Sequence, residues 1–144
     1  MGKPIVEMVR DYFKTCPLLS EDIKVDFLDS EEESFSIEVT PVNPIVRRYV
    51  DGSSERQFLF TLASRRFYAT DGNRQNIDNL NLFEHLNMWL ENNMYDGILP
   101  EMAENQEPLS VTAVTGGYLF SVNDGKQNAR YQIQCKLTYR EKGR

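Results

Sequence analysis

The sequence predicts an α+β fold in which two principal helices pack on one face of a mainly antiparallel sheet. Two segments repeat apolar residues at the three- and four-residue spacing of a helix, and several others alternate apolar and polar residues as strands do. The chain has 144 residues, of which 40% are hydrophobic and 11% aromatic. This is enough for one core without disulfides or metal, so residues 1–144 are expected to form a single α+β domain.

The first predicted element is an N-terminal helix over residues 1–16. Pro4 suits a first helical turn, and the helix is expected to end at Cys16 and Pro17. Its apolar residues share one face: Ile5, Met8, Val9, Tyr12 and Phe13.

Residues 23–68 are predicted to form strands. The segments 23–27 and 35–40 alternate apolar and polar residues, and the acidic run 29–33 joins them, which predicts a hairpin. Pro41 and Pro44 are expected to end its ladder.

A central strand is predicted from Gln57 to Tyr68. Its FLFTLA segment has apolar residues on both sides, which indicates a strand that is covered on both faces. A helix over residues 76–96 follows, with Asn76 or Asp78 as its cap and Gly97 at its end. Its apolar stripe consists of Leu82, Phe83, Leu86, Trp89, Leu90 and Met94.

Residues 109–140 are predicted to form the last strands, at 109–114, 118–122 and 131–139, with turns at 116–117 and 123–125. The last strand has the clearest alternation in the chain. Its polar positions are Gln132, Gln134, Lys136, Thr138 and Arg140.

The charges are unevenly distributed along a chain of net charge −6, which is the opposite of what a duplex-binding protein needs. Lys and Arg are absent from Gln75 to Gly125, whereas acidic residues occur throughout: Asp78, Glu84, Glu91, Asp96, Glu101, Glu104, Glu107 and Asp124. Arginines concentrate earlier, at Arg47, Arg48, Arg56, Arg65, Arg66 and Arg74. Surfaces of opposite charge would suit a head-to-tail contact between identical copies. An uneven but merely solvated surface is the alternative.

No catalytic constellation emerges from the residue types. His85 is the only histidine, and no residue has the frame of a nucleophile elbow. The carboxylates of 29–33 do not converge, and the segment 71–82 lacks the glycine and closing glutamate of a calcium loop. No glycine pattern suits a phosphate. We therefore expect no catalytic, cofactor-binding or metal-binding residues, and no cofactor.

Cys16 and Cys135 lack metal-binding spacing and are expected to be buried thiols. Charges interrupt the apolar residues of the N-terminus, and no segment approaches the roughly 18 apolar residues of a membrane span. A cytoplasmic protein without a membrane partner is expected.

Several strings resemble a prophage minor capsid protein family of Gram-positive bacteria: DGSSERQFLF (51–60), ASRRFY (63–68), the segment 76–93, ILP (98–100), GYLF (117–120) and ARYQIQCKLTY (129–139). The likeness covers most of the chain from about Phe35 onward. By element order the chain is also similar to the tail-terminator and head-tail joining proteins of long-tailed phages. The resemblance implies a small subunit that forms a ring, commonly a hexamer, and moves from the bacterial host cytoplasm into the virion.

The sequence thus supports a non-enzymatic structural virion protein, whose partners are further copies of itself and a phage tail-tube or connector protein. The expected interface charges are Arg47, Arg48, Arg65 and Arg66 on one side and Glu84, Glu91, Glu101 and Glu104 on the other. Two alternatives stay open. Aromatic residues beside the arginines at 47–49 and 65–68 would suit a single-stranded nucleic-acid platform, against which the net charge argues. A small hydrolase or resistance enzyme would have to use His85.

Overall fold

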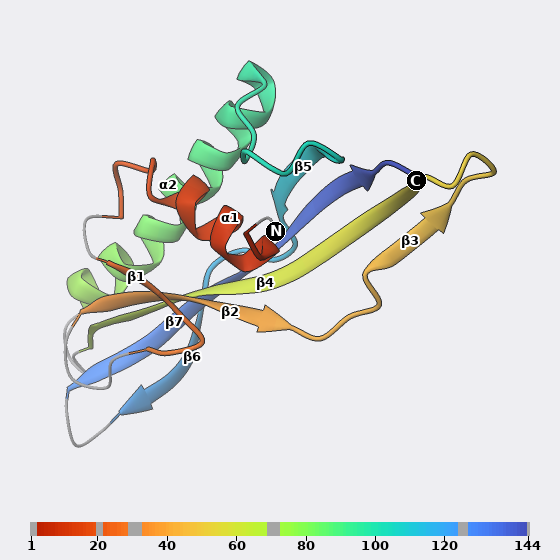
Figure 1. Cartoon of the computed structure of the whole chain (residues 1–144). Helices are drawn as coiled ribbons and strands as arrows, with labels where there is room; N and C mark the ends of the chain where they lie inside the picture. Colours follow the sequence, from red (N-terminus) through yellow and green to blue (C-terminus); the bar gives the residue numbers. More distant parts are fainter. Residues whose placement is uncertain (1–2, 20–21, 29–32, 69–72, 124–126, 144) are drawn as a thin grey trace.

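The computed structural model describes residues 3–19, 22–28, 33–68, 73–123 and 127–143 (Figure 1). In these residues the chain forms two helices and a seven-stranded, mostly antiparallel sheet, which confirms the predicted α+β class. The elements are α1 (Ile5–Phe13), β1 (Ile23–Val25), β2 (Ser34–Thr40), β3 (Ile45–Arg48), β4 (Ser54–Phe67), α2 (Asn73–Asp96), β5 (Gln106–Ala113), β6 (Tyr118–Asn123) and β7 (Asn128–Glu141). Neither of the described helices has the length and apolar character needed to cross a membrane.

Two antiparallel strands of 14 residues each, β4 and β7, form the centre of the sheet. Each is flanked by two shorter strands in succession: β2 and then β3 pair with β4, and β5 and then β6 pair with β7. β1 adds to the outer side of β2. The central position predicted for the FLFTLA segment is therefore confirmed, whereas the predicted cover on both faces is not, because both helices lie on the same side of the sheet.

Both helices pack on one face of the sheet. Phe13 of α1 contacts Phe60 of β4, with ring centroids 5.7 Å apart, and Phe83 of α2 stacks on Tyr131 of β7 at 6.5 Å. Trp89 of α2 lies 5.6 Å from Phe13, so the helices also contact each other. A single hydrophobic cluster joins the helices to this face. The opposite face carries neither helix, and we call it the open face.

The predicted hairpin of 23–27 and 35–40 is wrong, because β1 pairs with β2 in parallel. β1 has only three residues and is followed by Asp26, whose φ is +51°. The Asp26 N–H donates to the Ile37 carbonyl (2.9 Å), and its carboxylate accepts from the Val39 N–H (3.0 Å). Aspartate tolerates this left-handed backbone better than most residues, so it turns the chain directly after β1.

The prolines interrupt the β4 ladder without ending it, and β3 is a strand that the sequence does not predict. Within the interruption the Pro44 carbonyl accepts from the Gln57 N–H (2.8 Å), and the Asn43 side chain accepts from the Ile45 N–H (3.0 Å). Pairing resumes at β3 because neither Pro41 nor Pro44 lies where the ladder requires an N–H.

The expected turn at 116–117 does not reverse the chain, because β5 and β6 both run antiparallel to β7. Gly117 instead allows the strand to approach α2 closely: an added Cβ would come within 2.6 Å of the Phe83 Cγ. The predicted turn at 123–125 and the acidic run 29–33 fall largely outside the described residues.

The helix bounds differ modestly from those predicted. α1 is shorter than 1–16, and α2 begins at Asn73 instead of residue 76. The predicted end at Gly97 is confirmed, with φ +74°. The Gly97 N–H donates to the Met94 carbonyl (3.3 Å) and the Ile98 N–H to the Asn93 carbonyl (2.8 Å), as in a Schellman motif.

Candidate functional site

The four arginines predicted at an interface do not form one patch. Arg47 and Arg48 lie on β3, opposite the first residues of β4, whereas Arg65 and Arg66 lie near its other end. Ser54 and Arg65 are separated by roughly 36 Å along an extended strand. Neighbouring residues of a strand point to opposite sides of the sheet. Arg47 and Arg65 therefore lie on the open face, and Arg48 and Arg66 lie on the face that the helices cover.

These arginines also differ in their partners. Arg66 forms an ion pair with Glu33 (3.3 Å), and Arg65 has an interaction partner as well. Arg47 and Arg48 are exposed, and neither forms an ion pair within the described part of the chain. The charges of Arg47 and Arg48 are therefore available to another molecule.

The four predicted glutamates form two separate groups. Glu84 and Glu91 are exposed on α2, where a separation of seven residues places them on the same side of the helix. Neither forms an ion pair with another described residue. Glu101 and Glu104 follow the helix and precede β5, whose first residue pairs with Glu141 at the same end of the sheet as β3.

A hairpin arm, residues 45–55, projects from the sheet beside the C-terminus (Figure 1). Its exposed side chains combine apolar and basic character. Val50 is fully exposed and Val46 is 47% exposed, next to the exposed Arg47 and Arg48. The arm therefore presents apolar and basic side chains to solvent side by side.

The tip of the arm has a defined conformation. The Gly52 N–H donates to the Tyr49 carbonyl (3.1 Å), and Gly52 itself has a φ of +89°. The Asp51 carboxylate accepts from the Ser53 hydroxyl (2.6 Å) and N–H (2.9 Å), and these hydrogen bonds lower the pKa of Asp51. Arg140 of β7 donates to the Ser53 hydroxyl (3.2 Å) and lies 5.1 Å from the centre of the Tyr49 ring. Val50 is thus presented by an anchored turn, and Val46 by the strand β3 that leads to it.

The solvent side of α2 carries a stripe of apolar and acidic residues at helical spacing. We call it the outer stripe: Ile77, Leu80, Glu84, Met88, Glu91 and Tyr95. All six are exposed, and the stripe contains no cation. Its predominantly apolar residues distinguish it from an ordinary solvated helix face.

A groove of about 450 Å³ lies between the first turns of α2 and the strands β6 and β7. It is lined by Tyr68, Asn76, Ile77, Leu80, Gly117, Tyr118, Leu119 and Tyr131. Ile77 and Leu80 of the outer stripe form one wall. Among the described strands β6 pairs only with β7, so its other edge is open.

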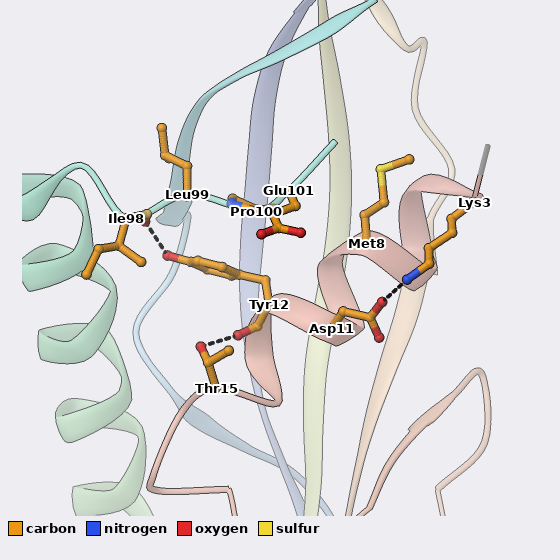
Figure 2. Close-up of a pocket in the computed structure, with 9 residues that line it drawn as sticks. All are labelled: Lys3, Met8, Asp11, Tyr12, Thr15, Ile98, Leu99, Pro100 and Glu101. Carbon is orange, nitrogen blue, oxygen red and sulfur yellow. Dashed lines mark hydrogen bonds and ion pairs between the residues drawn. The ribbon is translucent and has the colours of Figure 1, made fainter. Parts of the chain in front are cut away.

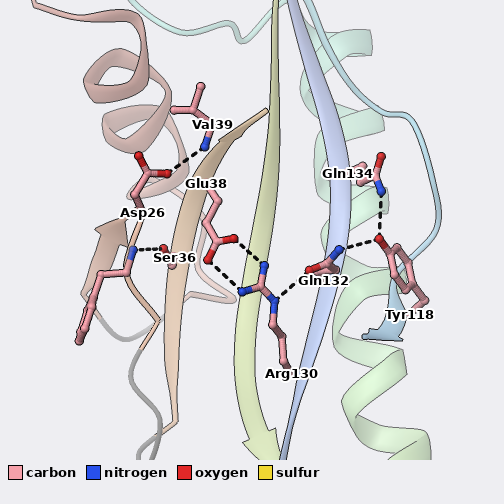
Figure 3. A network of polar contacts seen from close by, with 9 residues as sticks. Asp26, Ser36, Glu38, Val39, Tyr118, Arg130, Gln132 and Gln134 are labelled. Carbon is pink, nitrogen blue, oxygen red and sulfur yellow. Dashed lines mark hydrogen bonds and ion pairs between the residues drawn. The ribbon is translucent and has the colours of Figure 1, made fainter. Parts of the chain in front are cut away.

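The open face carries a connected row of polar side chains (Figure 3). Arg130 of β7 donates two hydrogen bonds to Glu38 of β2 (2.6 and 3.0 Å) and one to Gln132 (2.9 Å). The Tyr118 hydroxyl accepts from Gln132 (2.6 Å) and Gln134 (2.9 Å). The row therefore links β2, β7 and β6.

Three basic residues of the open face, Arg130, Lys136 and Arg140, were not among the predicted interface residues. The alternation of β7 already placed Lys136 and Arg140 on the polar side of the strand. That pattern could therefore have identified them as basic residues of one sheet face. Sequence clustering of arginines selected other positions because it does not register which face a residue occupies.

A second cavity, of about 390 Å³, lies between α1 and the segment 98–101 (Figure 2). The Tyr12 hydroxyl donates to the Ile98 carbonyl (3.0 Å) and accepts from the Asn93 amide (3.0 Å). Lys3 pairs with Asp11 (2.8 Å) at its rim, and this contact raises the pKa of Lys3. The side chains of Tyr12, Asn93, Lys3 and Asp11 are thus engaged within the protein, and the predicted interface residue Glu101 also lines this cavity.

The chemistry-bearing residues outside these surfaces are dispersed. His85 is exposed on α2 and lines neither cavity. Among the described residues no three His, Cys, Asp or Glu side chains gather as metal ligands would. Cys16 and Cys135 are buried free thiols, as predicted.

No protein-family model matches this sequence, and no curated protein matches it.

Proposed function

We propose that the chain is a structural (pro)phage virion protein, a minor capsid or tail-terminator-like subunit that associates head-to-tail with further copies. One observation supports this best: the hairpin arm exposes Arg47 and Arg48, and α2 exposes Glu84 and Glu91, all without ion pairs in the described residues. Available charges of opposite sign on two different surfaces favour a contact between copies.

Such a contact is heterologous, because each copy would use its arm on one side and its outer stripe on the other. A heterologous contact produces a ring when the rotation between copies closes and a filament when it does not. The resemblance to tail-terminator proteins favours a ring at the tail end or head-tail joint. The tail-tube or connector protein would then dock on the ring, after assembly in the bacterial host cytoplasm.

Electron microscopy of phage lysates tests this role. Deletion of the gene is expected to give filled heads beside separate tails of uncontrolled length, and the wild-type gene should restore complete virions. The variant Arg47→Glu/Arg48→Glu should fail to restore them. Lys14→Glu/Lys24→Glu, which makes the same charge change at exposed positions outside the arm and α2, should succeed. Complete virions from the deletion would contradict the proposal.

A second candidate function, binding of single-stranded nucleic acid, is favoured by the aromatic residues of the open face. Arg130 lies 5.0 Å from the centre of the Phe120 ring, and Phe120 is 58% exposed. Exposed rings beside cations are the usual stacking platform for single strands. Binding of an oligothymidylate that weakens steeply with salt and with Phe120→Ala would support this candidate, and absence of binding at low salt would exclude it.

A further inference from the structure

The exposed valines of the hairpin arm lack cover in the described structure. Val50 is exposed although the turn that carries it is anchored by Arg140 and Asp51, and Val46 is exposed on the adjoining strand β3. An ordered hairpin that holds apolar side chains in water costs free energy that an intermolecular contact would recover.

The groove between α2 and β6 has the complementary properties. Its walls are mainly apolar, and Ile77, Leu80 and Leu119 are each 41% exposed or more. Three arginines at this end of the sheet form ion pairs with carboxylates: Arg66 with Glu33, Arg74 with Asp78 and Arg130 with Glu38. Glu84, one helical turn beyond Leu80, has no such partner among the described residues.

We propose that the tip of the hairpin arm of one copy occupies this groove in the next copy, with Val50 against Leu80 and Leu119. This inference rests on the proposed self-association and names the apolar contact within it.

The spacing of residues on the arm is compatible with their proposed partners on α2. Val50 and Arg47 are at most roughly 10 Å apart along the chain, and Leu80 and Glu84 are about 6 Å apart along the helix, so an arginine side chain spans the difference.

The arm cannot reach the groove of its own chain. It pairs with β4 at Ser54, whereas Leu119 lies opposite Tyr131, which pairs with Ser64. Ser54 and Ser64 are separated by roughly 33 Å along the strand. A contact between arm and groove therefore joins two copies, and its repetition places every copy head-to-tail along the same direction.

Cysteine cross-linking tests the inference directly. Val50→Cys chains are mixed with Leu119→Cys chains and oxidised mildly, and the products are separated under denaturing conditions. The matched control mixes Val50→Cys with Leu109→Cys, because Leu109 lies on the neighbouring edge strand β5 with nearly the same exposure, 42% against 41%. The native thiols do not interfere, since Cys16 and Cys135 are at most 2% exposed.

We expect a covalent dimer from the Leu119 mixture at least tenfold in excess of that from the Leu109 mixture or from either chain alone. The native mass of each mixture is measured in parallel. Assembly without a Leu119 cross-link, or equal cross-linking at Leu109, would overturn the arm-in-groove contact and leave self-association intact. A chain that stays monomeric would overturn both.

Discussion

Glu38 and Arg130 form a two-hydrogen-bond ion pair across the central strand β4. Glu38 pairs in register with Thr61 and Arg130 with Arg65, so the line between them crosses β4 at Ala63. Ala63 is fully buried although the open face carries no helix. A small residue there lets the two side chains meet, and their contact excludes water from the middle of the strand.

Glu38→Gln is expected to destabilise the protein by about 1–3 kcal/mol, because it leaves a mostly buried guanidinium without its carboxylate. Denaturant unfolding measures the change. Asp78→Asn is the matched control: it breaks the exposed Arg74–Asp78 pair (3.5 Å) and should change stability by less than about 0.5 kcal/mol. Equal effects of the two substitutions would contradict this reading of the open face.

Gly117→Ala is expected to destabilise the protein by about 1–3 kcal/mol, since the new methyl group would overlap the buried Phe83 side chain. Gly116→Ala provides the control, because nothing lies within 4 Å of the Cβ it would add. Thermal unfolding of the two variants should therefore differ clearly. Similar melting temperatures would mean that β6 does not approach α2 this closely.

Tyr12→Phe should lower the free energy of unfolding by about 1–3 kcal/mol, because the buried Asn93 amide loses its acceptor and the Ile98 carbonyl its donor. Tyr95→Phe removes a hydroxyl from a side chain that is 92% exposed and should have no effect on unfolding. If both variants unfolded like the wild type, the tie between α1 and the end of α2 would be absent.

The thiols of the folded protein should be nearly inert to thiol reagents at pH 8, and both should react once denaturant unfolds the chain. Burial raises the pKa of Cys135 to about 12 and also raises that of Cys16. The pKa of Cys135 is higher in the folded state than in the unfolded state, so folding favours the neutral thiol. The stability that this difference contributes is fully present below about pH 9 and is lost as the pH rises toward 12. Rapid labelling of two thiols without denaturant would contradict it.

The sequence predicted the elements whose local patterns are long. The unbroken alternation of β7, the apolar stripe of α2 and the glycine at its end were sufficient to place them. β3 has only four residues between prolines and a glycine turn, and its pairing depends on β4 rather than on its own pattern. β1 has only three residues, and alternation does not encode whether a strand runs parallel or antiparallel to its neighbour.

The candidate site was predicted less well, because charge clustering along a chain does not give faces or ends. Adjacent arginines of a strand point to opposite sides, which separates Arg65 from Arg66. Residues seven positions apart in a helix lie on the same side, so Glu84 and Glu91 share one side of α2. The groove joins α2 to β6 and β7, segments far apart in the sequence, and no local pattern foretells it.

Native mass measurement of charge-reversed chains tests the central claim most directly. At about 0.15 M salt, the wild type should form a discrete oligomer, whereas Arg47→Glu/Arg48→Glu and Glu84→Lys/Glu91→Lys should each remain monomeric. An equimolar mixture of the two variants should recover the oligomer, because each reversed surface then meets its complement. A monomeric wild type, or single reversals that assemble as the wild type does, would contradict head-to-tail association through these residues.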